Sequence, residues 1–218
     1  MDLRLALITE GASEHRILKH ILQCYCLEEP EINQIQPQIV GNKQVSVGGW
    51  REVLRFCENR ESDLLEILKY NDYIIIQIDT DMCQISPFDV PKIDSLGQPL
   101  SEEDLWFSVQ QRILNALPVS IPKDRVILAI CIDMIECWLL PVYATNTKHA
   151  CRTSNCLNNL NKDLRRNNIH IITEKNSTEA HRTYDTILKS LRKRKDIEHC
   201  SSFHFGFQQF IDALKTFD

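Results

Sequence analysis

The feature of this sequence that most constrains its fold is the alternation of short apolar runs with amphipathic stretches. The runs span residues 3–8, 73–78 and 126–131, and apolar residues recur at helical spacing in the stretches between them. Strands that are apolar almost throughout are buried on both faces, as they are in parallel sheets. The alternation therefore predicts an α/β protein whose mainly parallel central sheet is flanked by helices.

The remaining segments are less regular. Residues 28–37 are predicted to form a loop, and residues 38–47 a strand that Gly41 and Asn42 interrupt. Ser13 and Ser101 precede helical patterns and are predicted N-caps. Helices are also expected near residues 50–68, from Ile135, and near residues 157–166, 180–194 and 207–217, with a short strand over 170–173.

Length and composition favour one α/β domain with an appendage. The chain has 218 residues, of which 43% are apolar, so it can bury one substantial core. We expect the α/β domain to cover residues 1–143 and a basic, mainly helical C-terminal extension to cover residues 144–218. No apolar run reaches the roughly 18 residues of a membrane span, so we expect a soluble, cytoplasmic protein without membrane contact.

Acidic residues stand where three of the predicted strands end. Glu10 and Glu14 follow the first run, Asp79 and Asp81 follow the second, and Glu136 follows the third. Because ligands collect at the carboxyl ends of strands in an open α/β sheet, we expect these side chains to gather there. Gathered carboxylates repel one another unless a hard cation or a shared proton offsets the charge. A divalent ion is the simpler solution, so the pattern predicts a metal site.

Each acid also has a structural explanation. Asp79 and Asp81 point to the same side in extended geometry and could bind one Mg²⁺ or bridge two ions. Aspartates nevertheless end many strands simply by forming turns. Glu14 lies in a first helical turn, where a carboxylate also stabilises the helix dipole without any ligand.

The positive charge of the chain is concentrated in one segment, although the formal net charge is −5. Residues 148–195 contain twelve basic residues and four acidic ones. A cationic region beside an acidic metal site would suit a protein that binds a polyanion such as DNA or RNA. The alternative is that the charged run is only a solvated helix face.

Cysteines, histidines and tryptophans carry weaker signals. The nine cysteines, Cys137 among them, are predicted to be mostly buried free thiols. Cys151, Cys156 and His149 form an incomplete zinc set and are assigned to a loop. His15 and His20 lack the spacing of a ligand pair and are expected to be surface or partly buried residues. The three tryptophans are expected in the core.

Together, the acids after three strands resemble the TOPRIM fold. Glu10-Gly11 with Glu14 is similar to the first motif of the overcoming-lysogenisation-defect (OLD) nucleases, and Asp79-Thr80-Asp81 is similar to the TOPRIM DxD motif. The stretches 135–140 and 200–203 resemble small stand-alone TOPRIM-like proteins of bacteria whose function is mostly unassigned. The resemblance covers residues 3–143 and extends loosely over the remainder.

The resemblance implies phosphodiester chemistry with Mg²⁺ or Mn²⁺. Glu10 would act as a general acid or base and metal ligand, Asp79 and Asp81 would hold metal, and Glu14 and Glu136 would complete a second site. Lys175 would be the lysine that OLD-type nucleases place near the metal. The chain contains no GxxxxGK[ST] phosphate loop, so a partner ATPase would be another chain.

These patterns predict a metal-dependent nuclease acting on DNA or RNA, with an anti-phage role beside a partner ATPase as a further expectation. The alternative is a non-catalytic TOPRIM-like module that binds nucleic acid, a nucleotide or a protein. A phosphatase or nucleotide hydrolase would share the metal and differ in substrate. The sequence leaves oligomerisation open.

Overall fold

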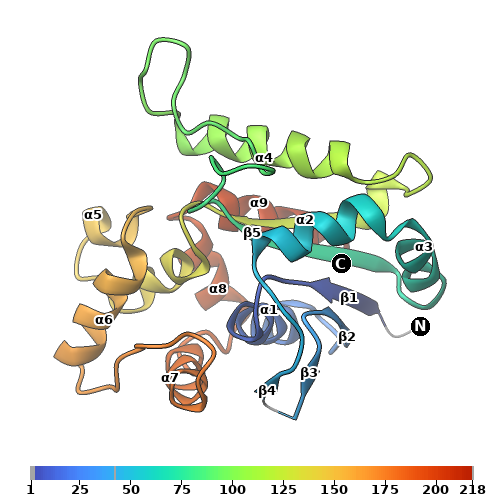
Figure 1. Ribbon diagram of the computed structural model, residues 1–218. Coiled ribbons are helices and arrows are strands. Elements are labelled where there is room, and N and C mark those ends of the chain that lie inside the picture. Colours follow the sequence, from blue (N-terminus) through green and yellow to red (C-terminus); the bar gives the residue numbers. More distant parts are fainter. Residues whose placement is uncertain (1–2, 42, 218) are drawn as a thin grey trace.

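A four-stranded parallel sheet forms the centre of the computed structural model, which describes residues 3–41 and 43–217 (Figure 1). The strands lie in the order β2-β1-β5-β6, where β1 is Arg4–Ile8, β2 is Glu31–Gln36, β5 is Tyr73–Asp79 and β6 is Val126–Cys131. All three pairings are parallel. The predicted α/β class with a helix-flanked parallel sheet is confirmed.

From β1 the chain first crosses to β2, which lies on one side of β1 in the sheet. It then returns to β5, which lies on the other side of β1. The strand order therefore reverses between β1 and β5. In doubly wound folds, ligands bind in the crevice at this switch point, outside the carboxyl ends of the strands. The fold thus has one edge at which a site is expected.

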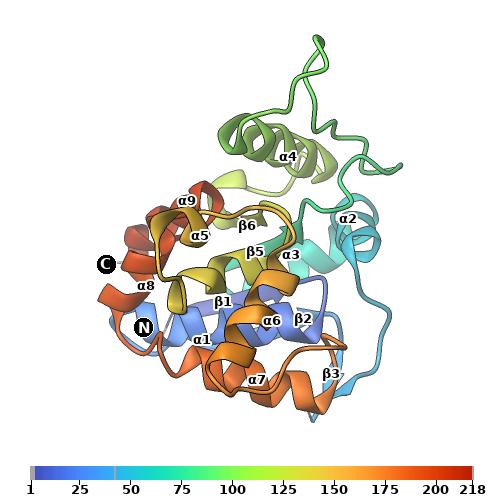
Figure 2. The same cartoon turned by 90° about the vertical axis from the view of Figure 1, so that its left-hand side faces the viewer.

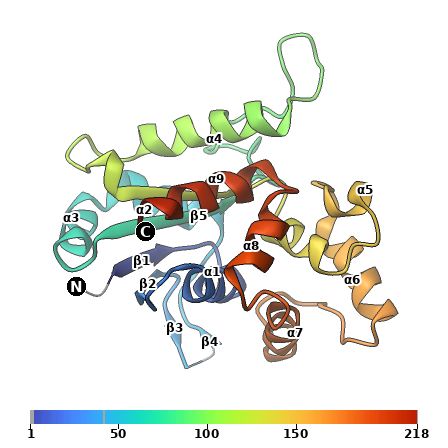
Figure 3. The ribbon, with the colours of Figure 1, turned by 180° about the vertical axis from the view of Figure 1, so that it is seen from behind.

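Side chains of the strands alternate between two hydrophobic layers. Leu5 and Leu7 pack with α1 (Ala12–Tyr25) and the C-terminal helices, whereas Ala6 and Ile8 face the opposite layer. That opposite layer contains α2 (Trp50–Asn59), α3 (Glu61–Tyr70) and α4 (Glu102–Ala116), and Figures 1 and 3 show the helices on the two sides. The three tryptophans are buried, as expected.

The prediction of a loop over residues 28–37 is wrong, because β2 occupies most of it. This strand, with the sequence EINQIQ, pairs only with β1 and stays half-exposed. An edge strand of this kind carries no apolar run, so its periodicity is hidden. The strand expected over residues 38–47 is a small hairpin of β3 (Ile39–Val40) and β4 (Lys43–Gln44).

The C-terminal part consists of short helices that share the core of the sheet. They are α5 (Thr147–Ala150), α6 (Cys156–Arg166), α7 (Thr178–Leu188), α8 (Arg194–Ser201) and α9 (Phe205–Leu214). Phe207 of α9 stacks on Trp138, with ring centroids 4.4 Å apart. One hydrophobic cluster consequently runs from Leu5 to Leu214.

Several local predictions need correction. Residues 170–173 form no strand, since Asn161 bonds both backbone groups of Ile172 at 2.8 Å and holds the segment as a loop. The helix expected over 180–194 ends at Leu188 as α7, and α8 begins only at Arg194 and extends to Ser201. Residues 135–142 form a 3₁₀ helix, η2 (Ile135–Val142). Ser101 caps α4 as predicted, accepting a bond from Asp104 N at 3.0 Å.

Among the described residues, no helix combines the length and the apolar character that crossing a membrane requires. Two shorter 3₁₀ helices, η1 (Lys123–Arg125) and η3 (Lys215–Phe217), complete the elements. The loop between β5 and α4 extends away from the sheet in Figures 1 and 2.

Candidate active site at the carboxyl ends of the strands

The candidate site lies at the switch point between β1 and β5. The register pairs Ile8 with Ile76, so the turn after β1, which holds Glu10, lies beside the end of β5, which holds Asp79. The backbone N–H of Asp79 donates to Oε1 of Glu10 at 2.6 Å. The two predicted motifs are therefore in direct contact through a carboxylate and a backbone group.

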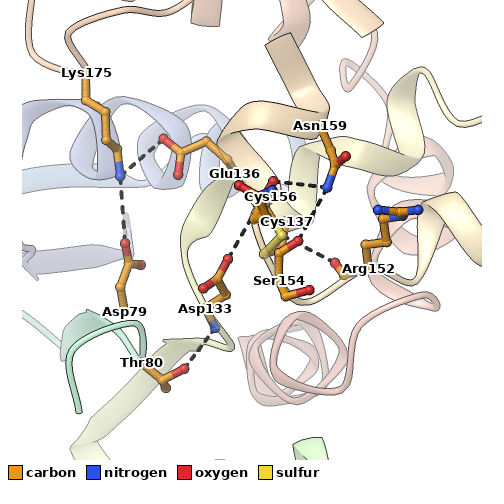
Figure 4. Close-up of a disulfide and its surroundings, with 11 residues drawn as sticks. Asp79, Thr80, Asp133, Glu136, Cys137, Arg152, Ser154, Cys156, Asn159 and Lys175 are labelled. Atoms are coloured by element: carbon orange, nitrogen blue, oxygen red, sulfur yellow. Dashed lines mark hydrogen bonds and ion pairs between the residues drawn. A yellow bond between two sulfur atoms is a disulfide. The ribbon is translucent and has the colours of Figure 1, made fainter. Parts of the chain in front are cut away.

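Lys175 contacts three of the predicted acids, and Figure 4 shows its ammonium group between Asp79 and Glu136. Its ammonium nitrogen lies 2.6 Å from Oε1 of Glu14, 3.2 Å from Oε1 of Glu136 and 3.7 Å from Oδ2 of Asp79. All three acids are buried, and the lysine side chain is 27% exposed. A lysine from the loop before α7 thus joins carboxylates from α1, β5 and η2.

Gln77 connects Asp79 to Glu10. Its Nε2 donates to Oδ1 of Asp79 at 2.8 Å, and its Oε1 accepts from the backbone N–H of Glu10 at 3.0 Å. The amide is completely buried, and it shares a face of β5 with Asp79 because side chains repeat every second residue along a strand. Gln77 therefore fixes one oxygen of Asp79 and leaves Oδ2 toward Lys175.

The loop that carries Lys175 is held by the first turn of α1. The hydroxyl of Ser13 donates to the carbonyl of Lys175, and the backbone N–H of Ser13 donates to Oδ1 of Asn176 at 3.3 Å. The prediction that Ser13 caps α1 is wrong. Gly11 occupies the N-cap without a side-chain bond, and the buried serine positions the lysine instead.

Two glycines allow close approach around the site. A Cβ at Gly11 would lie 2.5 Å from Oε2 of Glu14 and would displace that carboxylate. A Cβ at Gly48 would collide with the backbone carbonyl of Glu10, which accepts a bond from the N–H of Gly49 at 2.7 Å. The Gly48-Gly49 pair thus lets the chain before α2 pack against the turn after β1.

Glu136 is the most deeply buried acid of the site. It is 0% exposed, and its Oε1 accepts a bond from the hydroxyl of Tyr184 on α7 in addition to its contact with Lys175. Its other oxygen, Oε2, is buried and has no hydrogen-bond partner among the described residues. An orphaned carboxylate oxygen marks a position where a bound cation or proton would be favourable.

Asp81 lies at the exposed rim rather than in the cluster. Its backbone N–H donates to the carbonyl of Asp133 at 2.9 Å, and the N–H of Asp133 donates to Oγ1 of Thr80 at 2.8 Å. These bonds tie the end of β5 to the end of β6. Asp133 adopts a left-handed conformation with φ 63°, which aspartate and asparagine tolerate better than other residues that have a Cβ.

Burial and the neighbouring charges shift the pKa values of the ionisable side chains in the site. Burial, with added repulsion from Glu14 and Asp81, raises the pKa of Glu10 to about 8. Burial also raises the pKa of Asp79 well above its ordinary value, and that of Asp81 to a smaller degree. Burial opposes the charge of Lys175, but the attraction of Glu14, Glu136 and Asp79 prevails and raises its pKa well above the usual range.

The acids supply the donor type of a hard divalent ion, although among the described residues no three of them have oxygens that all lie within 4.8 Å of one another. Glu10, Glu14, Asp79 and Glu136 offer oxygen atoms only, which suits Mg²⁺ or Mn²⁺ better than zinc or copper. These acids outnumber the single lysine among them, and the orphaned Oε2 of Glu136 shows that Lys175 does not satisfy every oxygen. Glu10, Asp79 and Asp81 are the residues that would hold the ion, with Glu14 and Glu136 beside Lys175.

A separate group of potential ligands has a different explanation. Among the described residues, Asp133, Cys137 and Cys156 are the three whose ligand atoms all lie within 4.8 Å of one another. The two sulfurs are bonded to each other, with Cα atoms 5.0 Å apart, so the group is a disulfide next to an aspartate (Figure 4). The predictions of a free thiol at Cys137 and of a loop position for Cys156 are wrong, because packing of α6 on η2 joins them.

Sequence reasoning placed six residues in one site: Glu10, Glu14, Asp79, Asp81, Glu136 and Lys175. The structure brings five of them together and leaves Asp81 at the exposed rim. Sequence reasoning missed Gln77 and Tyr184, which hydrogen-bond to Asp79 and Glu136. Gln77 has a visible signal, since it is the one polar residue within the apolar run 74–78 and lies two positions before Asp79. Tyr184 has none, because only the docking of α7 brings it to Glu136.

Comparisons with protein-family models, with curated proteins and with solved structures found no match to this chain at the significance required. The site is therefore interpreted from its own residues.

Proposed function

We propose that this chain is a Mg²⁺- or Mn²⁺-dependent nuclease of TOPRIM-like fold that hydrolyses phosphodiester bonds of DNA or RNA. The observation that carries the proposal is the convergence of Glu14, Asp79 and Glu136 on Lys175, with Glu10 bonded to the backbone of Asp79 beside them. Only oxygen ligands meet there, at the switch point of the sheet. A partner ATPase in an anti-phage system remains part of the proposal.

Glu10, Asp79 and Asp81 would hold the divalent ion, which would supply a nucleophilic water and offset charge on the phosphate. Glu10 is the residue that would move a proton, because it lies beside Asp79 at the ends of the strands and burial raises the pKa of its carboxyl group above the ordinary value in the metal-free protein. Lys175 is held by Glu14 and Glu136 and can stabilise negative charge that develops on a phosphate oxygen. Gln77 and Ser13 orient Asp79 and Lys175 through their hydrogen bonds.

One observation favours a second candidate, the non-catalytic binding module. Lys175 already neutralises part of the acidic cluster, and a buried lysine among carboxylates can act as a permanent structural cation. In that case the site would bind no divalent ion and would turn over no substrate.

Cleavage assays separate the two candidates. Purified protein is incubated with single- and double-stranded DNA and RNA, and with small phosphate esters, in Mn²⁺, in Mg²⁺ or in EDTA. We expect metal-dependent cleavage of a nucleic acid by the wild type and a loss of at least about 100-fold in Asp79→Asn. Asp72→Asn, at the opposite end of β5, is the matched control and should cleave normally. Binding without turnover, or full activity of Asp79→Asn, would support the module instead.

A further inference from the structure

A cavity of about 520 Å³ lies between α1 and α7, beside the β3–β4 hairpin, on a different face of α1 from Glu14. Four cationic side chains line it, against one carboxylate; the cations are Arg16, Lys19, Lys189 and Arg192, and the acid is Asp185. Asp185 pairs with Arg16 at 2.8 Å. Lys19, Lys189 and Arg192 form no ion pair within the described residues, so the cavity keeps a net positive charge.

Two buried histidines also line this cavity. His181 is 4% exposed, and neither of its ring nitrogens has a hydrogen-bond partner among the described residues. His15 is 9% exposed, and its Nδ1 is likewise buried without a partner there. Buried polar atoms are normally bonded, so three such nitrogens beside one cavity are an unusual feature of this part of the molecule.

The remaining lining of the cavity is less polar, and the cavity is large enough for a molecule bigger than a single ion. Gln34, Ile39 and Leu188 add an amide and two aliphatic groups to the cationic wall. A cavity of this volume falls within the range of sites for small molecules, about 300–1,000 Å³. Arginine and lysine together are the usual partners of phosphate, and an amide next to aliphatic surface suits a base.

We propose that this cavity binds a nucleoside phosphate, either free or as part of a polynucleotide, with its phosphates on Arg16, Lys19, Lys189 and Arg192 and within reach of His15 and His181. The inference does not depend on the proposed nuclease activity. It concerns binding through cations on the outer side of α1 and α7, whereas hydrolysis concerns the acids at the ends of the strands.

His181 supplies a readout that a general surface charge would not. Burial and the nearby Arg16 lower the pKa of His181, with Asp185 and Glu14 opposing. Its ring is therefore neutral at pH 7 without ligand, and a phosphate dianion in the cavity would raise its pKa and favour uptake of a proton. Binding should accordingly strengthen as the pH falls.

The experiment measures binding by isothermal titration calorimetry in EDTA, so that metal chemistry plays no part. ATP and a short single-stranded oligodeoxynucleotide are the two probes. The test variant is Lys189→Gln/Arg192→Gln, and the matched control is Lys193→Gln/Lys195→Gln, which removes the same charge from exposed residues outside the cavity. We expect at least about tenfold weaker binding by the test variant and little change in the control.

A second set of titrations compares the binding affinity of the wild type with that of His181→Phe between pH 8 and pH 6. The titration of the ligand is common to both proteins, so a steeper strengthening of binding in the wild type isolates the histidine. Binding of ATP with this pattern supports a free nucleotide, and binding of the oligonucleotide alone supports a polynucleotide segment. No binding of either probe, or equal losses in the test and control variants, would overturn the proposal, whether or not the protein is a nuclease.

Discussion

The ammonium group of Lys175 lies 2.6 Å from Oε1 of Glu14, and this contact joins the loop before α7 to the first turn of α1. The pair is part of a cluster in which one lysine also contacts Glu136 and Asp79. A partly buried cation that pairs with buried carboxylates is costly to remove, because the acids that remain would repel one another in a medium of low dielectric constant.

Lys175→Met should therefore lower the free energy of unfolding by about 3–5 kcal/mol in metal-free buffer. A divalent ion should restore part of this loss, since it replaces the missing positive charge. Urea unfolding with EDTA and with Mn²⁺ measures both effects. Lys148→Met, at an exposed position, is the control for the charge change and should be nearly neutral. Equal stability of Lys175→Met and wild type would contradict the assigned contacts.

Tyr184→Phe should destabilise the protein by about 1–3 kcal/mol, because the buried carboxylate of Glu136 loses the hydroxyl that donates to its Oε1. The shape of the side chain is conserved, so packing should change little. Chemical denaturation measures the loss. Tyr70→Phe removes a hydroxyl from a side chain that is 61% exposed and should have no effect. Equal losses in the two variants would argue against the bond.

Stability should fall as the pH rises from about 4.5 to about 8, with Glu10 as one cause. The pKa of its carboxyl group is raised from 4.5 to about 8 in the folded state, so in this window the folded protein holds a proton that the unfolded chain has released. The stabilisation that comes from this proton is complete below pH 4.5 and is lost as the pH rises through about 8. Glu10→Gln should show a flatter dependence in thermal unfolding without metal. An unchanged slope would show that Glu10 titrates normally.

Much of the fold could be predicted because its central strands are visible in the sequence as continuous apolar runs. Residues 73–78 and 126–131 are apolar almost throughout, as both faces are covered, whereas β2 is a polar edge strand whose pattern is weak. Helix ends were harder to predict, since tertiary contacts decide them. Ser13 has the chemistry of an N-cap, yet its hydroxyl bonds to the Lys175 carbonyl.

The acids of the site could be predicted from their positions after strands, because parallel strands bring their carboxyl ends to one edge. The central place of Lys175 is not readable from spacing, since it follows from the docking of the segment before α7 on α1. The same applies to the bond between Cys137 and Cys156, which depends on the packing of α6 against η2.

Removal of the disulfide should cost about 2–4 kcal/mol, because it closes a loop with a sequence separation of 19 residues. Cys137→Ala/Cys156→Ala and the wild type are compared in urea, each with and without a reductant. The reductant should destabilise only the wild type. Cys151→Ser, which alters an exposed free cysteine, should behave as the wild type does. Insensitivity of the wild type to reductant would mean that the two thiols are not bonded in solution.

The central claim is that the acids at the strand ends hold a divalent ion. Anomalous diffraction from crystals soaked in Mn²⁺ tests it most directly. The proposal predicts a manganese peak bound by carboxylate oxygens of Glu10 and Asp79, and its loss in Asp79→Asn. A saturating soak that leaves no peak at these residues, with Lys175 still in contact with Glu14, Glu136 and Asp79, would contradict it.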